Sequence, residues 1–314
     1  MNNFESLIAA WLPERGSAPE FDPDFYRWMH PDLRRLNDAE LALHFQNHGR
    51  TEGRIASPGS HRLGFLGQVP QVPTLEIGPA VRPTLRGEHV KYFDISNREQ
   101  LIRRAMSEGY GVNNCPEIDY VSPVGDLSII DRTFDCVFSS HCIEHQPDLM
   151  RHLRKVAELL SPQGKYCLFV PDKRFCFDAL LPESTLEEVR VAHRHKRQVH
   201  THRSVYDHYV ETTHNDPVRH WNNDSEDPRR HQRVARREAA DAALREAGGG
   251  YVDVHAWQFT PRSFRSIVEG LVEDGLMLAI ERIYEPFRGS NEFGAILRKT
   301  EQRLSRYVSG LALT

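Results

Sequence analysis

Three residues near the middle of the chain have types and a spacing that could bind a metal. His141, Glu144 and His145 form the pattern H-x-x-E-H within "SSHCIEHQPD", which is one signature of zinc peptidases. Two imidazoles and a carboxylate could hold zinc and activate a water molecule. That chemistry requires a helix, which places both histidines on one face about one turn apart.

The sequence on either side of this pattern indicates a turn instead of a helix. His141 directly follows "FDCVFSS", an apolar run typical of a buried strand, and the helical pattern starts only at Pro147. The two histidines are therefore expected on a strand-to-helix turn, where their side chains need not converge. Either His145 packs or caps this turn, or the turn faces a ligand; zinc hydrolysis is the least favoured interpretation.

Residues 72–171 alternate between strand and helix patterns. Strands are expected at "VPTLEIG", "HVKYFDIS", "FDCVFSS" and "KYCLFVP". The helix "NREQLIRRAMSEG" has Asn97 as its cap and Gly109 as its stop, and "PDLMRHLRKVAELLSPQG" has Pro147 in its first turn. This alternation predicts a parallel sheet with helices on both faces. Ligands of such sheets bind at the carboxyl ends of the strands.

The composition of the chain suggests five segments. Residues 1–57 are expected to form short helices, and 58–71, rich in Gly, Pro and Ser, to form a linker. Residues 72–298 would be the main domain, interrupted at 172–250 by a helical insertion rich in His and Arg. Residues 251–298 are expected to form a strand, a helix and two strands, and 299–314 a tail.

The overall composition limits the classes of function. The 314 residues carry a formal net charge of −4, which argues against a protein that binds nucleic acid through bulk charge. No apolar run is long enough for a membrane span, and the N-terminus lacks the features of a signal peptide. The five cysteines form no C-x-x-C pair. We expect reduced, buried cysteines and a cytoplasmic protein.

The order "LEIGPA", "YFDIS" and "FDCVFSSHCIEHQPDLMRHLRKVAELLSPQGKYCLFVP" resembles the class I S-adenosylmethionine-dependent methyltransferases of the small-molecule type. The resemblance covers residues 72–172 and, more weakly, 251–298. It implies an α/β fold: a Rossmann-like, seven-stranded, mostly parallel sheet with an antiparallel last strand. The chain departs from the family's E-x-G-x-G pattern at Pro79 and Ala80.

The resemblance also implies a set of residues that contact S-adenosylmethionine. This cofactor has no phosphate, so one glycine suffices to let the backbone approach it, and a carboxylate after the second strand can accept hydrogen bonds from the ribose. Asp94 could instead cap a helix, and Glu76 could be a solvated loop carboxylate. The implied contacts are Glu76, Gly78 and Pro79 for the methionine end, Asp94 and Ile95 for the ribose, Asp126 and Leu127 for adenine, and Ser140 and His141 beneath the sulfonium.

An acceptor hydroxyl would also need a base, and histidine suits that role near neutral pH. We expect the base among His145, Asp172, His208 and His255. The insertion holds eight of the chain's 17 histidines between positions 193 and 231. These could bind a divalent metal or an anionic acceptor, or they could form a solvated basic surface.

The N-terminal segment suggests an acceptor. "FDPDFYRWMHPDLRRL…LHFQNHGRTEGR" resembles a helical segment of bacterial proteins that build cell-surface polysaccharides, often beside glycosyltransferases. It could instead be a helical cap on the main domain. We expect an O-methyltransferase for a sugar hydroxyl of a surface glycan or a nucleotide-sugar precursor. The alternatives are a methyltransferase for RNA or a lipid-like molecule, or a non-catalytic module of a glycan-assembly complex.

Overall fold

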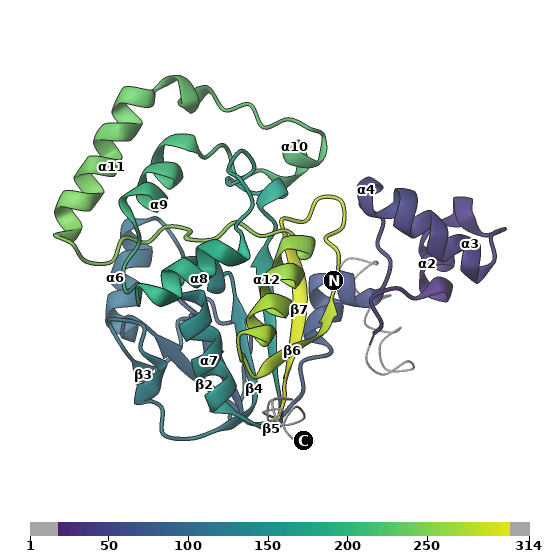
Figure 1. Ribbon diagram of the computed structural model, residues 1–314, viewed down its shortest axis with the longest axis horizontal. Coiled ribbons are helices and arrows are strands. Elements are labelled where there is room, and N and C mark those ends of the chain that lie inside the picture. Colours follow the sequence, from purple (N-terminus) through teal and green to yellow (C-terminus); the bar gives the residue numbers. More distant parts are fainter. Residues whose placement is uncertain (1–17, 302–314) are drawn as a thin grey trace, which may run out of the picture.

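The computed structural model describes residues 18–301, and its centre is a seven-stranded sheet with the order β3-β2-β1-β4-β5-β7-β6 (Figure 1). All paired neighbours are parallel except β7, which runs antiparallel to both β5 and β6. The predicted Rossmann-like α/β fold is confirmed. The strands are β1 (Thr74–Ile77), β2 (Val90–Asp94), β3 (Tyr120–Val121), β4 (Phe134–Ser140), β5 (Leu160–Pro171), β6 (Leu278–Ile283) and β7 (Glu292–Lys299).

Both faces of the sheet are covered, because side chains along each strand alternate between two apolar clusters. Val137 of β4 packs into the larger cluster with α7, α8 and α12. Phe138, its neighbour, packs into a second cluster on the other face with Phe65. The helices that cover the first face are α7 (Leu149–Leu159), α8 (Leu186–Arg194) and α12 (Pro261–Glu273).

The first predicted helix is confirmed, but the second, predicted over 147–164, is shorter at both ends, because residues 160–164 belong to β5. α6 (Arg98–Ser107) begins with a capping box at Asn97, and Gly109 lies just beyond its end with φ of 78°. α7 is capped by Asp148 and begins at Leu149, so Pro147 precedes the helix and does not lie in its first turn. The Asp148 side chain accepts the free N–H of Arg151, and this contact fixes the start.

Residues 58–71 are a packed part of the fold, which corrects the predicted linker. They contain a 3-10 turn, η3 (Pro58–Ser60), and α5 (Arg62–Leu66). Phe65 is almost fully buried, and its ring lies 4.6 Å from that of Phe169. A Cβ on Gly59 would lie 2.3 Å from Tyr284. The glycines and prolines here allow close packing against the sheet.

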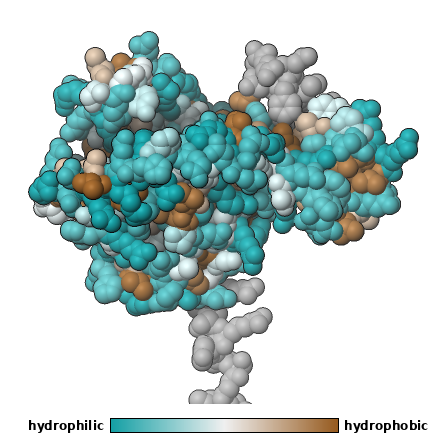
Figure 2. Space-filling model, turned by 90° about the horizontal axis from the view of Figure 1, so that it is seen from above, coloured by the Kyte–Doolittle hydropathy of each residue, from teal (hydrophilic) through white to brown (hydrophobic). Residues whose placement is uncertain are grey.

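The N-terminal segment forms a small lobe beside the main body (Figures 1 and 2). Its elements are α2 (Pro23–Met29), η1 (Pro31–Leu33), α3 (Asp38–His44), η2 (Phe45–Gly49) and α4 (Arg50–Glu52). Its own core includes Tyr26, Leu41 and Phe45. Gly53 accepts a backbone hydrogen bond from Arg288 (2.9 Å), so the lobe is joined to the turn between β6 and β7.

The insertion after β5 is helical, as predicted, and passes over the carboxyl edge of the sheet (Figure 1). It contains η6 (Lys173–Phe175), α8, α9 (His202–Tyr206), η7 (Asp207–Glu211), α10 (Pro217–Trp221), η8 (Pro228–His231) and α11 (Arg233–Ala247). The strand predicted after it is not formed. Residues 251–259 are extended, and only Phe259 makes an isolated bridge, to Asp172.

The five cysteines are buried and free, as expected. No helix within residues 18–301 is long and apolar enough to cross a bilayer. The predictions for the first 17 residues, and for all but the first positions of the 299–314 tail, lie outside the described residues.

Candidate active site

Gly78 and Asp94 lie side by side at the carboxyl ends of β1 and β2. The strands pair in register up to Ile77 and Phe93, and the Gly78 N–H donates to the Phe93 carbonyl (2.8 Å). Gly78 has φ of 70°, a backbone region that favours glycine. Two positions separated by a strand and a loop are therefore brought to one rim, as the sequence predicts.

The Asp94 carboxylate is mostly buried, at 7% exposure, and holds the loops on either side of it. The N–H of Ala80 donates to Oδ2 (3.3 Å), and that of Ser96 donates to Oδ1 (3.1 Å). Burial raises the pKa of Asp94 because it disfavours the charged form. Each oxygen has one protein donor here and retains a lone pair for a further donor.

Glu76 is a buried part of the loop structure, not a solvated carboxylate. It is 2% exposed, and its two oxygens accept from the N–H groups of Thr84 (2.7 Å) and Leu85 (2.9 Å). Burial raises its pKa. Glu76 therefore fixes the loop that begins with Gly78 and Pro79, and its own contact with a cofactor stays a prediction.

The residues predicted near ribose and adenine have mixed environments. Ile95 is 37% exposed at the end of β2, and a Cβ on Gly125 would lie 3.9 Å from it. Asp126 caps the short turn η4 (Leu127–Ile129) by accepting from the Ser128 N–H (3.0 Å). Leu127 is buried in the main core. Its predicted contact with adenine stays a prediction.

The turn after β4 lies directly against Gly78. A Cβ on Gly78 would lie 3.7 Å from the Cys142 thiol. His141 has φ of 50°, a strained conformation for a residue other than glycine. Its Nε2 lies 2.8 Å from a Glu292 oxygen. Burial opposes the protonation of His141, but Glu292 and Glu144 outweigh this and raise its pKa.

Ser140, the last residue of β4, accepts from the Arg62 guanidinium (3.3 Å), which also pairs with Glu292 (2.7 Å). Ser140 and His141 thus lie on the same network, at the edge where the sequence predicts the floor of the cofactor site. Their contact with a sulfonium stays a prediction.

Two residues of the H-x-x-E-H pattern, Glu144 and His145, lie close together, and the side chain of His255 joins them from far along the chain. Glu144 and His145 belong to the short turn η5 (Ile143–His145). His145 Nε2 lies 3.7 Å and His255 Nε2 lies 3.9 Å from the same oxygen, Glu144 Oε1. The two rings meet edge to face with centroids 4.7 Å apart. Glu144, His145 and His255 form one group, which we call the histidine–carboxylate cluster.

Backbone hydrogen bonds bring His255 to this turn. The N–H groups of Ala256 (2.6 Å) and Trp257 (3.2 Å) donate to the Glu144 carbonyl. The Trp257 indole N–H donates to the Gln146 carbonyl (2.6 Å). Residues 251–259 are thus held on the turn after β4 instead of in the sheet. No sequence pattern links these segments, and Glu144 was not among the predicted site residues.

Two further carboxylates support the histidines of the cluster. His255 Nδ1 is 2.6 Å from Asp178 Oδ2, and His145 Nδ1 is 3.0 Å from Asp253 Oδ1. Burial opposes the protonation of His145, but Asp253 and Glu144 raise its pKa. Asp253 also pairs with Arg104 (2.6 Å).

His208, another predicted base, borders the cluster. Its ring centroid lies 6.2 Å from that of His255, and Phe177 contacts both rings. Burial and the neighbouring His255 lower the pKa of His208 to about 4. His208 is therefore neutral near pH 7 and is a weak base.

Asp172 does not fit the predicted role of a base. It is fully buried, and the Arg174 guanidinium grips both of its oxygens (2.9 and 2.6 Å). It also accepts the N–H of Arg174 and caps η6. Because Arg174 neutralises its charge, the Asp172 carboxylate stabilises the turn after β5. This corrects the prediction that Asp172 could be the base.

The histidines of the insertion do not form one site. His193 lies 3.0 Å from Asp148, at the start of α7. His214 and His220 stack on each other with centroids 4.1 Å apart, and their nitrogens bond to nearby protein groups. Of the predicted bases in the insertion, only His208 reaches the cluster.

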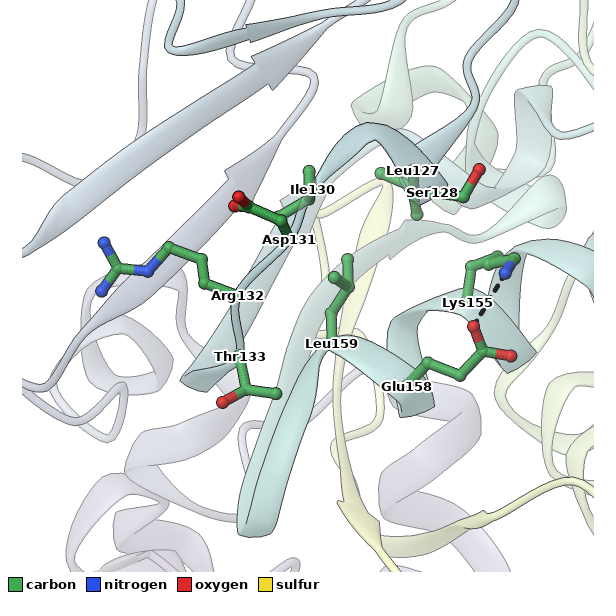
Figure 3. Close-up of a pocket in the computed structure, with 9 residues that line it drawn as sticks. All are labelled: Leu127, Ser128, Ile130, Asp131, Arg132, Thr133, Lys155, Glu158 and Leu159. Atoms are coloured by element: carbon green, nitrogen blue, oxygen red, sulfur yellow. Dashed lines mark hydrogen bonds and ion pairs between the residues drawn. The ribbon is translucent and has the colours of Figure 1, made fainter.

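An open hollow of about 950 Å³ lies elsewhere, between η4 and the end of α7 (Figure 3). Leu127, Lys155 and Glu158 are among its lining residues, and Lys155 pairs with Glu158 one turn further along α7 (2.8 Å). It extends to Thr133, just before β4, and so toward the amino end of that strand. Ligands of parallel sheets bind at the opposite edge. The hollow is therefore a poorer candidate than the rim at Gly78.

Comparisons with known proteins agree with this assignment. Residues 78–168 match a family model described as a methyltransferase domain. Among curated proteins, none matches this sequence. The chain therefore contains a methyltransferase domain where the sequence predicts one, and S-adenosylmethionine is the cofactor that this assignment implies.

Solved structures of methyltransferases resemble the chain at low identity. An S-adenosylmethionine-dependent methyltransferase from Mesorhizobium loti is 16% identical, over 74% of this chain and 92% of its own, with a TM-score of 0.37. The CcbJ methyltransferase from Streptomyces caelestis is 12% identical, over 76% and 87%, with a TM-score of 0.38. The mitomycin 7-O-methyltransferase MmcR is 12% identical, over 86% and 58%, with a TM-score of 0.33.

Proposed function

We propose that this chain transfers a methyl group from S-adenosylmethionine to a sugar hydroxyl of a bacterial surface glycan or its nucleotide-sugar precursor. The observation that carries the methyl transfer is the rim formed by Gly78 and Asp94, which lies inside the matched domain. The turn with Glu144 and His145 lies beside this rim, since Cys142 nearly contacts Gly78.

The rim fits the cofactor in two respects. Asp94 is buried but has one backbone donor on each oxygen, so it can accept hydrogen bonds from two ribose hydroxyls. Gly78 leaves the space above it open, with no atom nearer than 3.7 Å to an added Cβ. When bound, S-adenosylmethionine supplies a methyl group on a positively charged sulfur, which an acceptor displaces in line.

An oxygen acceptor is supported by the histidine–carboxylate cluster. A hydroxyl must lose its proton as the carbon–oxygen bond forms, and a placed base contributes roughly 10²–10⁴-fold to the rate. Glu144 and His145 present acceptor atoms two and three residues after Cys142, which lies against Gly78, and His255 joins them from the extended segment 251–259. An acceptor that reacts without losing a proton would not need this group.

The glycan acceptor is supported by the N-terminal lobe. The residues of its F-D-x-x-F-Y pattern lie in or against the core of the lobe. Gly53, from the H-G-x-x-E-G-R pattern, has φ of 69°, and a Cβ there would lie 2.6 Å from Trp221 of the insertion. The lobe therefore contacts the insertion that covers the carboxyl edge. We propose that it lies near the acceptor, in the cytoplasm, beside glycosyltransferases.

The test is a methyl-transfer assay with a panel of acceptors. The full chain is incubated with labelled S-adenosylmethionine and nucleotide sugars, lipid-linked oligosaccharides, a quinol or RNA. The proposal predicts label, and a mass gain of one methylene unit, on a sugar-containing acceptor. Transfer only to RNA or the quinol would support the alternative acceptors, and binding of the cofactor with no transfer would support a non-catalytic module.

A further inference from the structure

Glu144 is fully buried, and within residues 18–301 neither of its oxygens has a hydrogen-bond partner. A buried carboxylate without a partner is costly. Three imidazole nitrogens lie near its Oε1, at 3.7 Å (His145 Nε2), 3.9 Å (His255 Nε2) and 3.9 Å (His141 Nδ1). These distances exceed those of hydrogen bonds. The imidazole nitrogens therefore surround the Glu144 oxygen without bonding to it.

The distances match the ligand shell of a metal ion. One atom from each of Glu144, His145 and His255 lies within 4.8 Å of the others. Zinc bonds to nitrogen and oxygen are about 2.0–2.2 Å long, which places neighbouring ligand atoms roughly 3–3.5 Å apart. The histidine nitrogens lie 3.7 and 3.9 Å from Glu144 Oε1, so shifts of a few tenths of an ångström would bring these two contacts close to that range.

The outer contacts follow the pattern of metal-bound histidines. Such histidines bind the ion through one nitrogen and donate from the other to a carboxylate. His255 Nδ1 is hydrogen-bonded to Asp178 (2.6 Å), whereas His145 Nδ1 lies 3.0 Å from Asp253 as an ion-pair contact without hydrogen-bond geometry. In both rings Nδ1 faces its carboxylate and leaves Nε2 facing Glu144.

The charges also favour a divalent cation. Glu144, Asp178 and Asp253 contribute three carboxylates around two histidines, and Arg104 pairs with one of them. With the two histidines neutral, three negative charges and one positive charge leave a net charge of −2, which a divalent cation would balance. His141 is not a ligand of this set, because its Nε2 is taken by Glu292 and, among the described residues, only Glu144, His145 and His255 have ligand atoms that all lie within 4.8 Å of one another.

We propose that Glu144, His145 and His255 bind a divalent transition-metal ion, such as zinc, beside the methyl-transfer site. Two imidazoles and a carboxylate suit such ions better than magnesium or calcium, which prefer oxygen ligands. The role of the ion rests on the proposed function: it would hold the acceptor hydroxyl and lower its pKa. The proposed metal site depends only on the positions of these three side chains and of the carboxylates beside them.

The experiment measures binding of Co²⁺, a coloured probe, to the full chain after chelator treatment, with Zn²⁺ as competitor. The wild type is expected to bind one equivalent saturably and to show the visible bands of a bound cobalt ion. Glu144→Gln and His255→Ala should weaken binding at least ~10-fold through loss of a ligand. Asp178→Asn, which keeps all three ligands, should weaken it ~10–100-fold.

His220→Ala is the matched control, because it removes another buried histidine and should bind cobalt as the wild type does. Absence of saturable binding by the wild type, or equal binding by all variants, would overturn the proposal. If Glu144→Gln fails to fold, Asp178→Asn carries the test. No cofactor or acceptor is present, so failure here is distinct from failure of the proposed function, which calorimetry with S-adenosylmethionine measures separately.

Discussion

Two pairs of histidine rings in the main body contact each other, and the pairs differ in what their nitrogens face. His145 and His255 meet edge to face (4.7 Å) with both Nε2 atoms toward Glu144. His214 and His220 stack (4.1 Å), and every ring nitrogen has a bonded protein partner. Those partners are the carbonyls of Asp224 and His214, the N–H of Asp216 and the hydroxyl of Ser225.

The difference shows that contact between buried histidines does not by itself indicate a site. The His214–His220 pair fastens a loop of the insertion, since its nitrogens satisfy backbone groups. The His145–His255 pair uses one nitrogen of each ring for orientation and leaves the other toward a carboxylate that has no hydrogen bond among the described residues. Only the second arrangement leaves atoms available for chemistry.

The largest expected effect is on methyl transfer. Glu144→Gln and His255→Ala should each lower kcat by roughly 10²–10⁴-fold. The hydroxyl that accepts the methyl group then loses the base or the ion that assists removal of its proton. His220→Ala should leave kcat unchanged. The measurement is kcat with the acceptor found in the panel, at a temperature where all variants are folded. Full activity of His255→Ala would mean that the His145–His255 pair, like the His214–His220 pair, has no role in catalysis, and it would contradict the comparison.

A second prediction concerns His152, which is also held neutral by the fold. Burial lowers its pKa to about 4, whereas an unfolded chain has a histidine pKa near 6.5. The unfolded state therefore takes up a proton first, and stability falls as the pH drops from ~6.5 to 4. The linked loss is on the order of 3 kcal/mol at most.

His152→Leu should remove this part of the acid sensitivity. The check is urea unfolding at neutral and mildly acidic pH, with the exposed His231→Leu as the control. A wild-type protein and a His152→Leu variant that lose equal stability on acidification would show that His152 is not the neutral core residue described here.

The smallest effect is expected on stability, at the stacked pair. His220→Ala removes bonds to the His214 carbonyl and to Ser225, and leaves a buried acceptor without a partner. The cost should be about 1–3 kcal/mol in the free energy of unfolding. Urea denaturation would measure it. No loss of stability would mean that this pair lacks the structural role assigned to it.

The sequence predicts best those features that depend on neighbouring residues. The strand ends at Gly78 and Asp94 and the cap of α6 at Asn97 follow from short patterns, and the resemblance to class I methyltransferases implies the antiparallel last strand. The rim at β1 and β2 could be predicted because parallel neighbours end at the same edge.

Features that depend on distant contacts were missed. The composition of residues 58–71 indicates a linker. In the structure, however, Phe65 packs against Phe169, and Gly59 lies against Tyr284. The cluster joins Glu144 to His255 through a backbone contact that no pattern announces. The available signal was the H-x-x-E-H match itself, which includes Glu144.

The central claim is that Gly78 and Asp94 form the site of S-adenosylmethionine, and calorimetry with that cofactor tests it most directly. The wild type should bind one equivalent, and Asp94→Asn should bind at least ~10-fold more weakly, because hydrogen bonds to a charged acceptor are worth about 1.5–3 kcal/mol. Asp119→Asn is the control and should bind as the wild type does, because Asp119 lies just before β3 and its carboxylate bonds to Lys91 and Tyr92 of β2. No heat with the wild type, or equal affinity in Asp94→Asn, would contradict the account.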